Sequence, residues 1–261
     1  MKTIFKLILL IAAGGLLSGF GGSNPGGTPF QPEAQMSYSN ATGPVPTGLQ
    51  SCGIPPMSAT TALRKALTFK SGCHIVRNST KPMAINDYSS SPPMIYLYKV
   101  ESGRYKCVGK TRVGWGSGRG VSRSRPLSCS DGAKQMTPPG FHVTRVHNGK
   151  RYNHSTSIGL NGLNGQGSVG RGVVMHGATY GMGGGSWGCP YFSMTAFKAI
   201  KSVLSPEGSM VYNYFGNAPK GPGCNSNAGV DPDPGSCRPD SGSGAGGSTI
   251  RGGRRGTRST R

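Results

Sequence analysis

The spacing of apolar residues predicts two amphipathic helices, one early and one late in the central part of the chain. Ser58 is expected to cap the first helix, which Gly72 ends, and Ser193 is expected to cap the second. Apolar residues recur three or four positions apart in both, so each helix has one face that must be buried. These residues are Ala62, Leu63, Ala66 and Leu67 in the first helix, and Ala196, Phe197, Ile200, Val203 and Leu204 in the second.

Alternating apolar and polar residues predict strands between the helices and after the second one. Ser102-Gly103 and Asn148-Gly149 are turn pairs that predict two hairpins. A short apolar run predicts a buried strand that ends at His176. The predicted extended runs are 94–100, 104–116, 140–152, 172–177 and 209–216.

Composition agrees with a strand-rich domain between two unstructured segments. The 261 residues include 45 glycines and 20 prolines, and 14% are charged, which favours strands and turns over helical bundles. Residues 23–57 are rich in Gly, Pro and Ser and are interpreted as a linker. Residues 217–261 are interpreted as a disordered, basic Gly/Ser/Arg-rich tail. The folded domain is therefore expected over residues 58–216.

Export is predicted from the N-terminal residues. Lys2 and Lys6 precede an apolar run over residues 7–17, and small residues follow it. The run is shorter than the roughly 20 residues that a membrane span needs, which favours a signal peptide over residues 1–22 rather than an uncleaved anchor. We therefore expect an exported protein in the periplasm or cell envelope.

A formal net charge of +21 predicts that the protein binds polyanions. Nucleic acid, anionic lipid and cell-wall polymers all suit this charge. The arginine-rich end of the tail is similar to segments that bind nucleic-acid backbones, but export argues against that partner. Anionic polymers of the wall or envelope are the expected partners, no nucleic acid is expected, and the protein is expected to be a monomer.

Residues 176–190, HGATYGMGGGSWGCP, place one histidine and one cysteine on either side of a glycine-rich loop. A thiol attacks a carbonyl as its thiolate, which a nearby imidazole or a helix N-terminus stabilises. Cys189 comes just before the second predicted helix, and His176 ends a strand. The backbone N–H groups of Trp187, Gly188 and Cys189 are candidates for an oxyanion hole. The pattern suits acyl transfer by a cysteine.

Two other interpretations of these residues stay open on spacing alone. A buried structural thiol beside an unrelated histidine explains the pattern as well as catalysis does. A metal site would combine His176 and Cys189 with His142, His147 or His154. The absence of a CxxC or HxxxH cluster disfavours metal binding, and no cofactor is expected.

His176-Gly177 followed by Ser186-Trp187-Gly188-Cys189 resembles the HG…S-x-G-C signature of YkuD-type L,D-transpeptidases. The proline that follows is typical of the S-x-G-C-P branch, often described as murein L,D-transpeptidase catalytic domains. The resemblance implies a mainly β fold, a YkuD-like β-sandwich or barrel with two or three short helices. Four further segments occur in the order of that family: 85–100, 114–118, 136–143 and 157–164.

The resemblance also implies roles for the motif residues. Cys189 would be the nucleophile, His176 the general base and acid, and the carbonyl of Gly177 would orient the imidazole. The substrate would be a peptidoglycan tetrapeptide stem, cut with release of D-alanine, and the thioester would pass to an amine or to water. The remaining residues of the oxyanion-hole motif are Ser186, Trp187 and Gly188.

The chain departs from the family at three points. The loop from Ala178 to Gly185 is short, Trp187 stands where other members have histidine, and Tyr191 stands where many have arginine. These departures concern donor and acceptor recognition more than the chemistry. The alternative function is a non-catalytic, cationic wall-binding protein on a degenerate transpeptidase fold.

Export places the seven cysteines in an oxidising compartment, where six can form three disulfides. Six cysteines allow 15 connectivities, which the sequence does not distinguish. Cys189 is expected to stay free because it lies in the glycine-rich motif. Proximity along the chain then favours the pairs Cys224–Cys237, Cys107–Cys129 and Cys52–Cys73.

Overall fold

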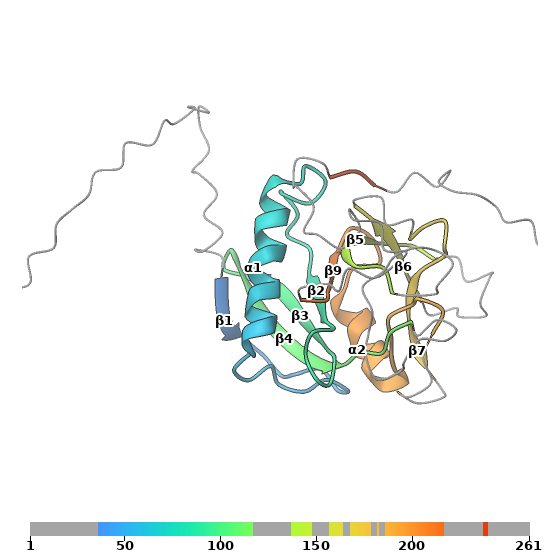
Figure 1. Cartoon of the computed structure of the whole chain (residues 1–261). Helices are drawn as coiled ribbons and strands as arrows, with labels where there is room; N and C mark the ends of the chain where they lie inside the picture. Colours follow the sequence, from blue (N-terminus) through green and yellow to red (C-terminus); the bar gives the residue numbers. More distant parts are fainter. Residues whose placement is uncertain are drawn as a thin grey trace, which may run out of the picture. The chain divides into compact units, whose positions relative to one another are not determined.

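The structure is a computed structural model that describes residues 36–116, 137–147, 157–163, 168–178, 182, 186–216 and 237–239 (Figure 1). The two helices of this part are α1 (Met57–Gly72) and α2 (Met194–Val203). None of its helices is both long and apolar enough to cross a lipid bilayer. The strands are β1 (Met36–Asn40), β2 (Met83–Asp87), β3 (Met94–Glu101), β4 (Arg104–Arg112), β5 (Gly140–Arg145), β6 (Ile158–Gly162), β7 (Val174–Ala178), β8 (Tyr191–Ser193) and β9 (Met210–Tyr214).

The strands form one nine-stranded sheet in the order β1-β4-β3-β2-β9-β5-β6-β7-β8. The last strand, β9, lies in the middle of the sheet, parallel to β2 and antiparallel to β5. Strands β2 and β9 are buried along their whole length, as expected for central strands covered on both faces. The fold is mainly β, as predicted.

Two apolar cores lie on opposite faces of the central strands, because successive side chains of a strand point to opposite faces. Met83 and Ile85 of β2 face α1, whereas Ala84 between them faces the core that contains α2. Aromatic stacking extends the first core from helix to sheet. The Phe69 and Phe141 ring centroids are 3.9 Å apart, and those of Phe141 and Tyr212 are 4.1 Å apart.

The sheet curls because the chain beyond β4 meets β8, which lies at the far end of the strand order. Gly114 N donates to Tyr191 O at 2.8 Å, and Tyr191 N donates to Gly114 O at 3.2 Å. Ser186 N also donates to Trp115 O at 3.2 Å. These bonds draw the two ends of the sheet together, so the predicted sandwich or barrel is present as one curled sheet.

Three predictions about local structure are confirmed. Ser193 caps α2, since its Oγ accepts a hydrogen bond from Ala196 N at 3.3 Å. The apolar faces of both helices are buried in the cores. Strands β3 and β4 form an antiparallel hairpin through Ser102 and Gly103, both with positive φ.

Other predictions differ from the structure. Ser58 does not cap α1, because the helix begins at Met57 and its N-cap residue is Pro56. The Oγ of Ser58 instead donates to Asp87 Oδ2 at 2.7 Å. The strand expected to end at His176 continues to Ala178, because β8 pairs alongside it. The predicted linker contains β1, which pairs with β4. The Asn148-Gly149 turn lies outside the described residues.

The disulfides pair residues that are distant in sequence, so the predicted pairs that involve Cys52, Cys73, Cys107 and Cys237 are wrong. Cys52 bonds to Cys107, and Cys73 bonds to Cys237. The physical reason is that strand and helix packing, not chain proximity, brings these positions together. Cys189 is free, as predicted. The remaining two predicted partners, Cys129 and Cys224, lie outside the described residues.

The Cys73–Cys237 bond ties part of the predicted tail to the end of α1. Next to it, Arg238 N donates to Leu163 O. The expected disorder of residues 217–261 therefore does not hold at 237–239, and the rest of the tail lies outside the described part of the chain.

Removing the Cys73–Cys237 bond should destabilise the domain strongly. The bond closes a loop of 164 residues, which in the chain-entropy model is worth roughly 5 kcal/mol. We expect the double substitution Cys73→Ser, Cys237→Ser to lower the free energy of unfolding in urea by an amount of that order. The matched variant, Cys52→Ser with Cys107→Ser, opens a 55-residue loop and should cost somewhat less. Equal unfolding midpoints for wild type and the first variant would contradict this.

Candidate active site

Pairing of β7 with β8 places His176 beside the backbone that adjoins Cys189. The two strands run parallel with His176 opposite Tyr191, and His176 N donates to Pro190 O at 3.2 Å. Pro190 directly follows Cys189. The backbone that carries the candidate nucleophile is therefore fixed beside the strand that carries the candidate base.

The His176 side chain is held by the backbone of its own strand. It is buried, and its Nδ1 lies 2.9 Å from the carbonyl oxygen of Gly177. A proton on Nδ1 donates to this carbonyl, and Nε2 is then the basic nitrogen. The contact implied by the family resemblance is present, whereas the catalytic roles of His176 and Gly177 stay predictions.

Position 177 has little room for a side chain. A Cβ there would overlap the Sδ atom of Met194, the first residue of α2. The absence of a side chain leaves room for the Met194 side chain over the strand that holds His176. Gly177 thus accepts the imidazole N–H and lies directly under this side chain.

The turn before Cys189 is shaped by Ser186 and Gly188. Ser186 Oγ donates to the carbonyl oxygen of Cys189 at 2.5 Å, which closes the turn. Gly188 is buried with φ +104°, a conformation that side chains disfavour. Trp187 between them is 76% exposed. The predicted oxyanion-hole roles of these residues remain predictions.

Burial raises the pKa of the Cys189 thiol. A hydrogen bond from the Val174 backbone and the positive charge of Arg171 act in the opposite direction. The expected stabilisation by a helix N-terminus is wrong, because β8 separates Cys189 from α2. The side chain of Cys189 is half-buried, and the balance of these effects favours the neutral thiol, so a base that takes its proton would assist attack on a carbonyl.

Three segments that precede the motif, within 85–100, 114–118 and 136–143, contact one another. Tyr88 is buried, its hydroxyl lies 3.5 Å from Gly114 O and also bonds to Thr137, and burial keeps its pKa far above the usual value. Gly116 N donates to Thr137 Oγ1 at 2.8 Å. Gly114 pairs with Tyr191, which joins these segments to the strand that follows Cys189. The family order of these segments was the only sequence signal that could have found them.

The histidines proposed for a metal site are engaged elsewhere. His142 Nδ1 lies 3.1 Å from Gly140 O and its Nε2 lies 3.0 Å from Ser168 Oγ, and burial lowers its pKa to about 4. His147 Nδ1 lies 2.6 Å from Ser157 Oγ. Within the described ranges, no three His, Cys, Asp or Glu side chains are placed to hold a metal ion. His154 lies outside these ranges.

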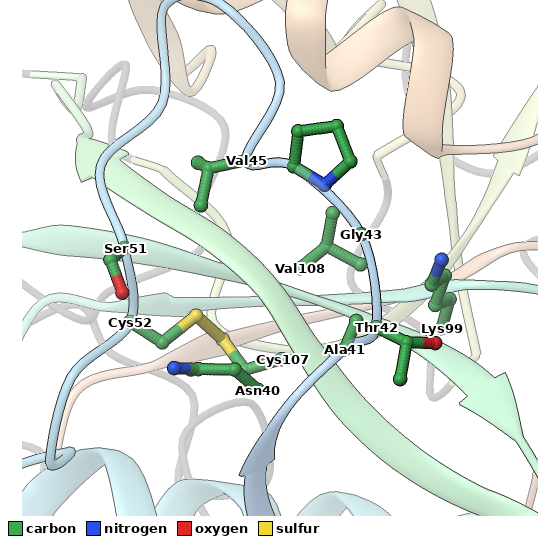
Figure 2. A pocket seen from close by; sticks show the side chains of 11 residues that line it. Asn40, Ala41, Thr42, Gly43, Val45, Ser51, Cys52, Lys99, Cys107 and Val108 are labelled. Carbon is green, nitrogen blue, oxygen red and sulfur yellow. A yellow bond between two sulfur atoms is a disulfide. The ribbon is translucent and has the colours of Figure 1, made fainter.

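A small pocket of about 130 Å³ lies away from the motif, around the Cys52–Cys107 disulfide (Figure 2). Its wall comes from the segment after β1 and from β3 and β4, with Thr42 and Lys99 among the polar side chains. No residue of the 176–190 motif lines it. This pocket is therefore not the candidate active site.

Gly114→Ala should distort the site, because a Cβ at Gly114 would overlap the Tyr191 ring. Overpacking of this kind costs about 1–3 kcal/mol, and we expect urea unfolding to show a loss of that size. If the clash is the cause, Gly114→Ala should lower the free energy of unfolding by almost nothing further when Tyr191 is already replaced by alanine. Additive losses in the double variant would contradict the assignment.

Comparison with known proteins identifies the family of the domain. The family model described as "L,D-transpeptidase catalytic domain" matches residues 56–214. Among curated proteins, no significant match is found.

Similar solved structures are remote. A fused Zn-dependent amidase/peptidase/peptidoglycan-binding domain-containing protein from Clostridium acetobutylicum is 16% identical, with 64% of this chain and 65% of that chain covered and a TM-score of 0.35. Bd1075 of Bdellovibrio bacteriovorus is 10% identical over 52% of this chain and 48% of that chain, with a TM-score of 0.38. The helical cell shape determining protein Pgp2 of Campylobacter jejuni is 16% identical over 51% and 48%, with a TM-score of 0.36.

The chain thus spans less than two thirds of the length of these solved proteins. The family model, in contrast, covers more than half of this chain and includes the strands that carry both His176 and Cys189. The chain belongs to the L,D-transpeptidase catalytic domain family.

Proposed function

We propose that this protein is an exported cysteine L,D-transpeptidase that remodels peptidoglycan as a monomer in the periplasm or cell envelope. The observation that carries the proposal is the pairing of β7 with β8, which places His176 beside the backbone of Cys189 and Pro190. The contact between His176 Nδ1 and the Gly177 carbonyl supports the assignment of His176 as the base. Family membership supports the same reaction class.

In the first half of the reaction, His176 Nε2 takes the proton of the Cys189 thiol as sulfur attacks the carbonyl carbon of the third stem residue. Backbone N–H groups of the 187–189 turn stabilise the oxyanion. The tetrahedral intermediate then breaks its C–N bond. D-Alanine leaves with the proton that His176 carried, and a thioester on Cys189 remains.

In the second half, an amine of another stem, a D-amino acid or water attacks the thioester. His176 takes a proton from this acceptor and returns it to the Cys189 sulfur as the C–S bond breaks. The products are a new amide, or a shortened stem when water is the acceptor. Transpeptidase and L,D-carboxypeptidase activity thus share one acyl-enzyme.

The net charge supports a second part of the proposal. A charge of +21 attracts polymers that carry carboxylates or phosphates, as those of the wall and envelope do. This attraction would concentrate the enzyme at its substrate and would weaken with added salt.

Incubation of the purified protein with tetrapeptide muropeptides, followed by mass analysis, tests the proposed activity. We expect loss of D-alanine, together with cross-linked, exchanged or shortened stems. Binding of sacculi without any product, at a level equal to that of Cys189→Ala, would favour the non-catalytic wall-binding alternative instead.

A further inference from the structure

We propose that Thr137 is a positioning residue that holds the turn of Cys189 in place through the backbone of residues 114–116. The inference rests on the proposed function for its kinetic consequence, because the exact position of the thiol matters for turnover only if Cys189 attacks a substrate. Thr137 lies outside the 176–190 motif, so the motif alone does not assign it this role.

The segment 114–116 pairs with the backbone on both sides of the candidate nucleophile. Before the cysteine, Ser186 forms a β-bridge with Gly116. After it, Gly114 and Tyr191 exchange two backbone hydrogen bonds of 2.8 and 3.2 Å. The turn that carries the thiol is therefore fixed to one segment at both of its ends, and a shift of that segment moves both ends.

The hydroxyl groups of Thr137 and Tyr88 hold this segment in turn. Gly116 N donates to Thr137 Oγ1 at 2.8 Å. The Thr137 hydroxyl also bonds to that of Tyr88, which donates to Gly114 O at 3.5 Å. Both side chains are buried, so these bonds are shielded from water. The three bonds connect the amide of Gly116 to the carbonyl of Gly114, and Thr137 is the link that accepts the buried amide.

Thr137→Val should loosen the segment without changing the reacting groups. Valine is similar to threonine in size and shape but has no hydroxyl, so the buried N–H of Gly116 loses its acceptor. The side chains of His176 and Cys189 stay as they are, but the turn that carries the thiol is held less firmly. Misplacement of a reacting group by about 1 Å can lower a rate about a hundredfold. We therefore expect kcat to fall about tenfold to a hundredfold while KM stays close to that of wild type.

Thr144→Val is the matched control. Thr144 is also buried, and its hydroxyl accepts a hydrogen bond from Ser209 N at 2.9 Å and donates to Ser205 O at 3.0 Å. Both partners lie between α2 and β9, outside the motif. The two valine variants should lower the thermal midpoint by similar amounts, but only Thr137→Val should lower kcat. Thr137→Ser keeps the hydroxyl and should turn over muropeptides at close to the wild-type rate.

Amide hydrogen exchange, followed residue by residue by NMR in the full-length protein, tests the link without substrate. In Thr137→Val, the Gly116 amide should exchange faster because it has lost its acceptor. The amides of Ser186 and Tyr191, which donate to the segment 114–116, should also exchange about threefold to tenfold faster, since the segment transmits the change. Thr144→Val should leave these amides at their wild-type rates.

Three results would overturn the proposal. The first is wild-type exchange at Ser186 and Tyr191 in Thr137→Val, which would confine the effect of the hydroxyl to Gly116. The second is an equal loss of kcat in Thr137→Val and Thr144→Val. The third is a Thr137→Ser variant as slow as Thr137→Val, because the hydroxyl would then not be the group that matters. If wild type turns over no muropeptide, the proposed function fails, and amide exchange still decides whether Thr137 holds the turn.

Tyr88→Phe takes the place of Thr137→Val if that variant does not fold. It removes the next hydroxyl of the chain of bonds and keeps the ring that stacks on Phe215, with centroids 4.6 Å apart. Exchange at Ser186 and kcat should change in the same directions by smaller factors. Wild-type values of both in Tyr88→Phe would overturn the proposal.

Discussion

Cys189→Ala should abolish turnover of tetrapeptide stems and leave the domain folded. Without the sulfur there is no covalent intermediate, and no other free thiol occurs among the described residues to replace it. The substitution leaves both observed disulfides and the Ser186 hydrogen bond to the backbone of residue 189 intact. Mass analysis of muropeptides measures turnover, and a thermal unfolding midpoint close to that of wild type shows that the fold is kept.

Cys189→Ser is the stricter form of the same experiment. It keeps the size of the side chain but supplies a hydroxyl, which is far harder to ionise than a thiol and should leave no detectable product. Wild-type turnover in either variant would show that the nucleophile lies elsewhere.

The pKa of the thiol adds a pH dependence. Because burial raises the pKa of Cys189, alkylation of the wild-type thiol should speed up as the pH rises through the usual thiol range and beyond it. The shift favours the neutral thiol, so reactivity is lost toward acid. An alkylation rate that is constant from neutral to alkaline pH would contradict the raised pKa of Cys189.

The local parts of the fold could be predicted because they depend on neighbours in sequence. The apolar face of α1, the Ser193 cap and the hairpin at Ser102-Gly103 follow from spacing and from turn chemistry within a few residues. The place of β9 in the centre of the sheet could not be predicted this way. Its pairing with β2 joins residues more than a hundred positions apart, and alternation of residues within a strand does not specify its partner.

The same contrast holds for the candidate site. His176, Gly177 and Cys189 lie within one short motif, so all three could be predicted as site residues from the sequence. Tyr88 and Thr137 contact Gly114 and Gly116, which pair with Tyr191 and Ser186 because the sheet curls. Neither residue type signals such a position. The expected helix N-terminus at Cys189 failed for a related reason. The three residues before α2 pair with β7, and the spacing of apolar residues in the sequence does not predict this pairing.

His176→Ala should lower turnover by about 10²–10⁴-fold, the range that a positioned general base contributes. The raised pKa of Cys189 makes this loss severe, because it favours the neutral thiol, which must lose its proton as it attacks. His147→Ala is the matched control. His147 also bonds through Nδ1, to Ser157, but it is not part of the motif, and its loss should leave turnover near that of wild type.

Alkylation separates the loss of a base from a general loss of structure. In wild type, His176 should assist ionisation of Cys189, so iodoacetamide should react faster at a given pH than it does with the variant. In His176→Ala this assistance is lost while burial still raises the pKa of the thiol, so its reaction should move to higher pH. An identical alkylation rate and pH profile in both proteins would show that His176 does not act as the base for Cys189. It would leave Cys189 as a thiol beside a histidine that serves the fold.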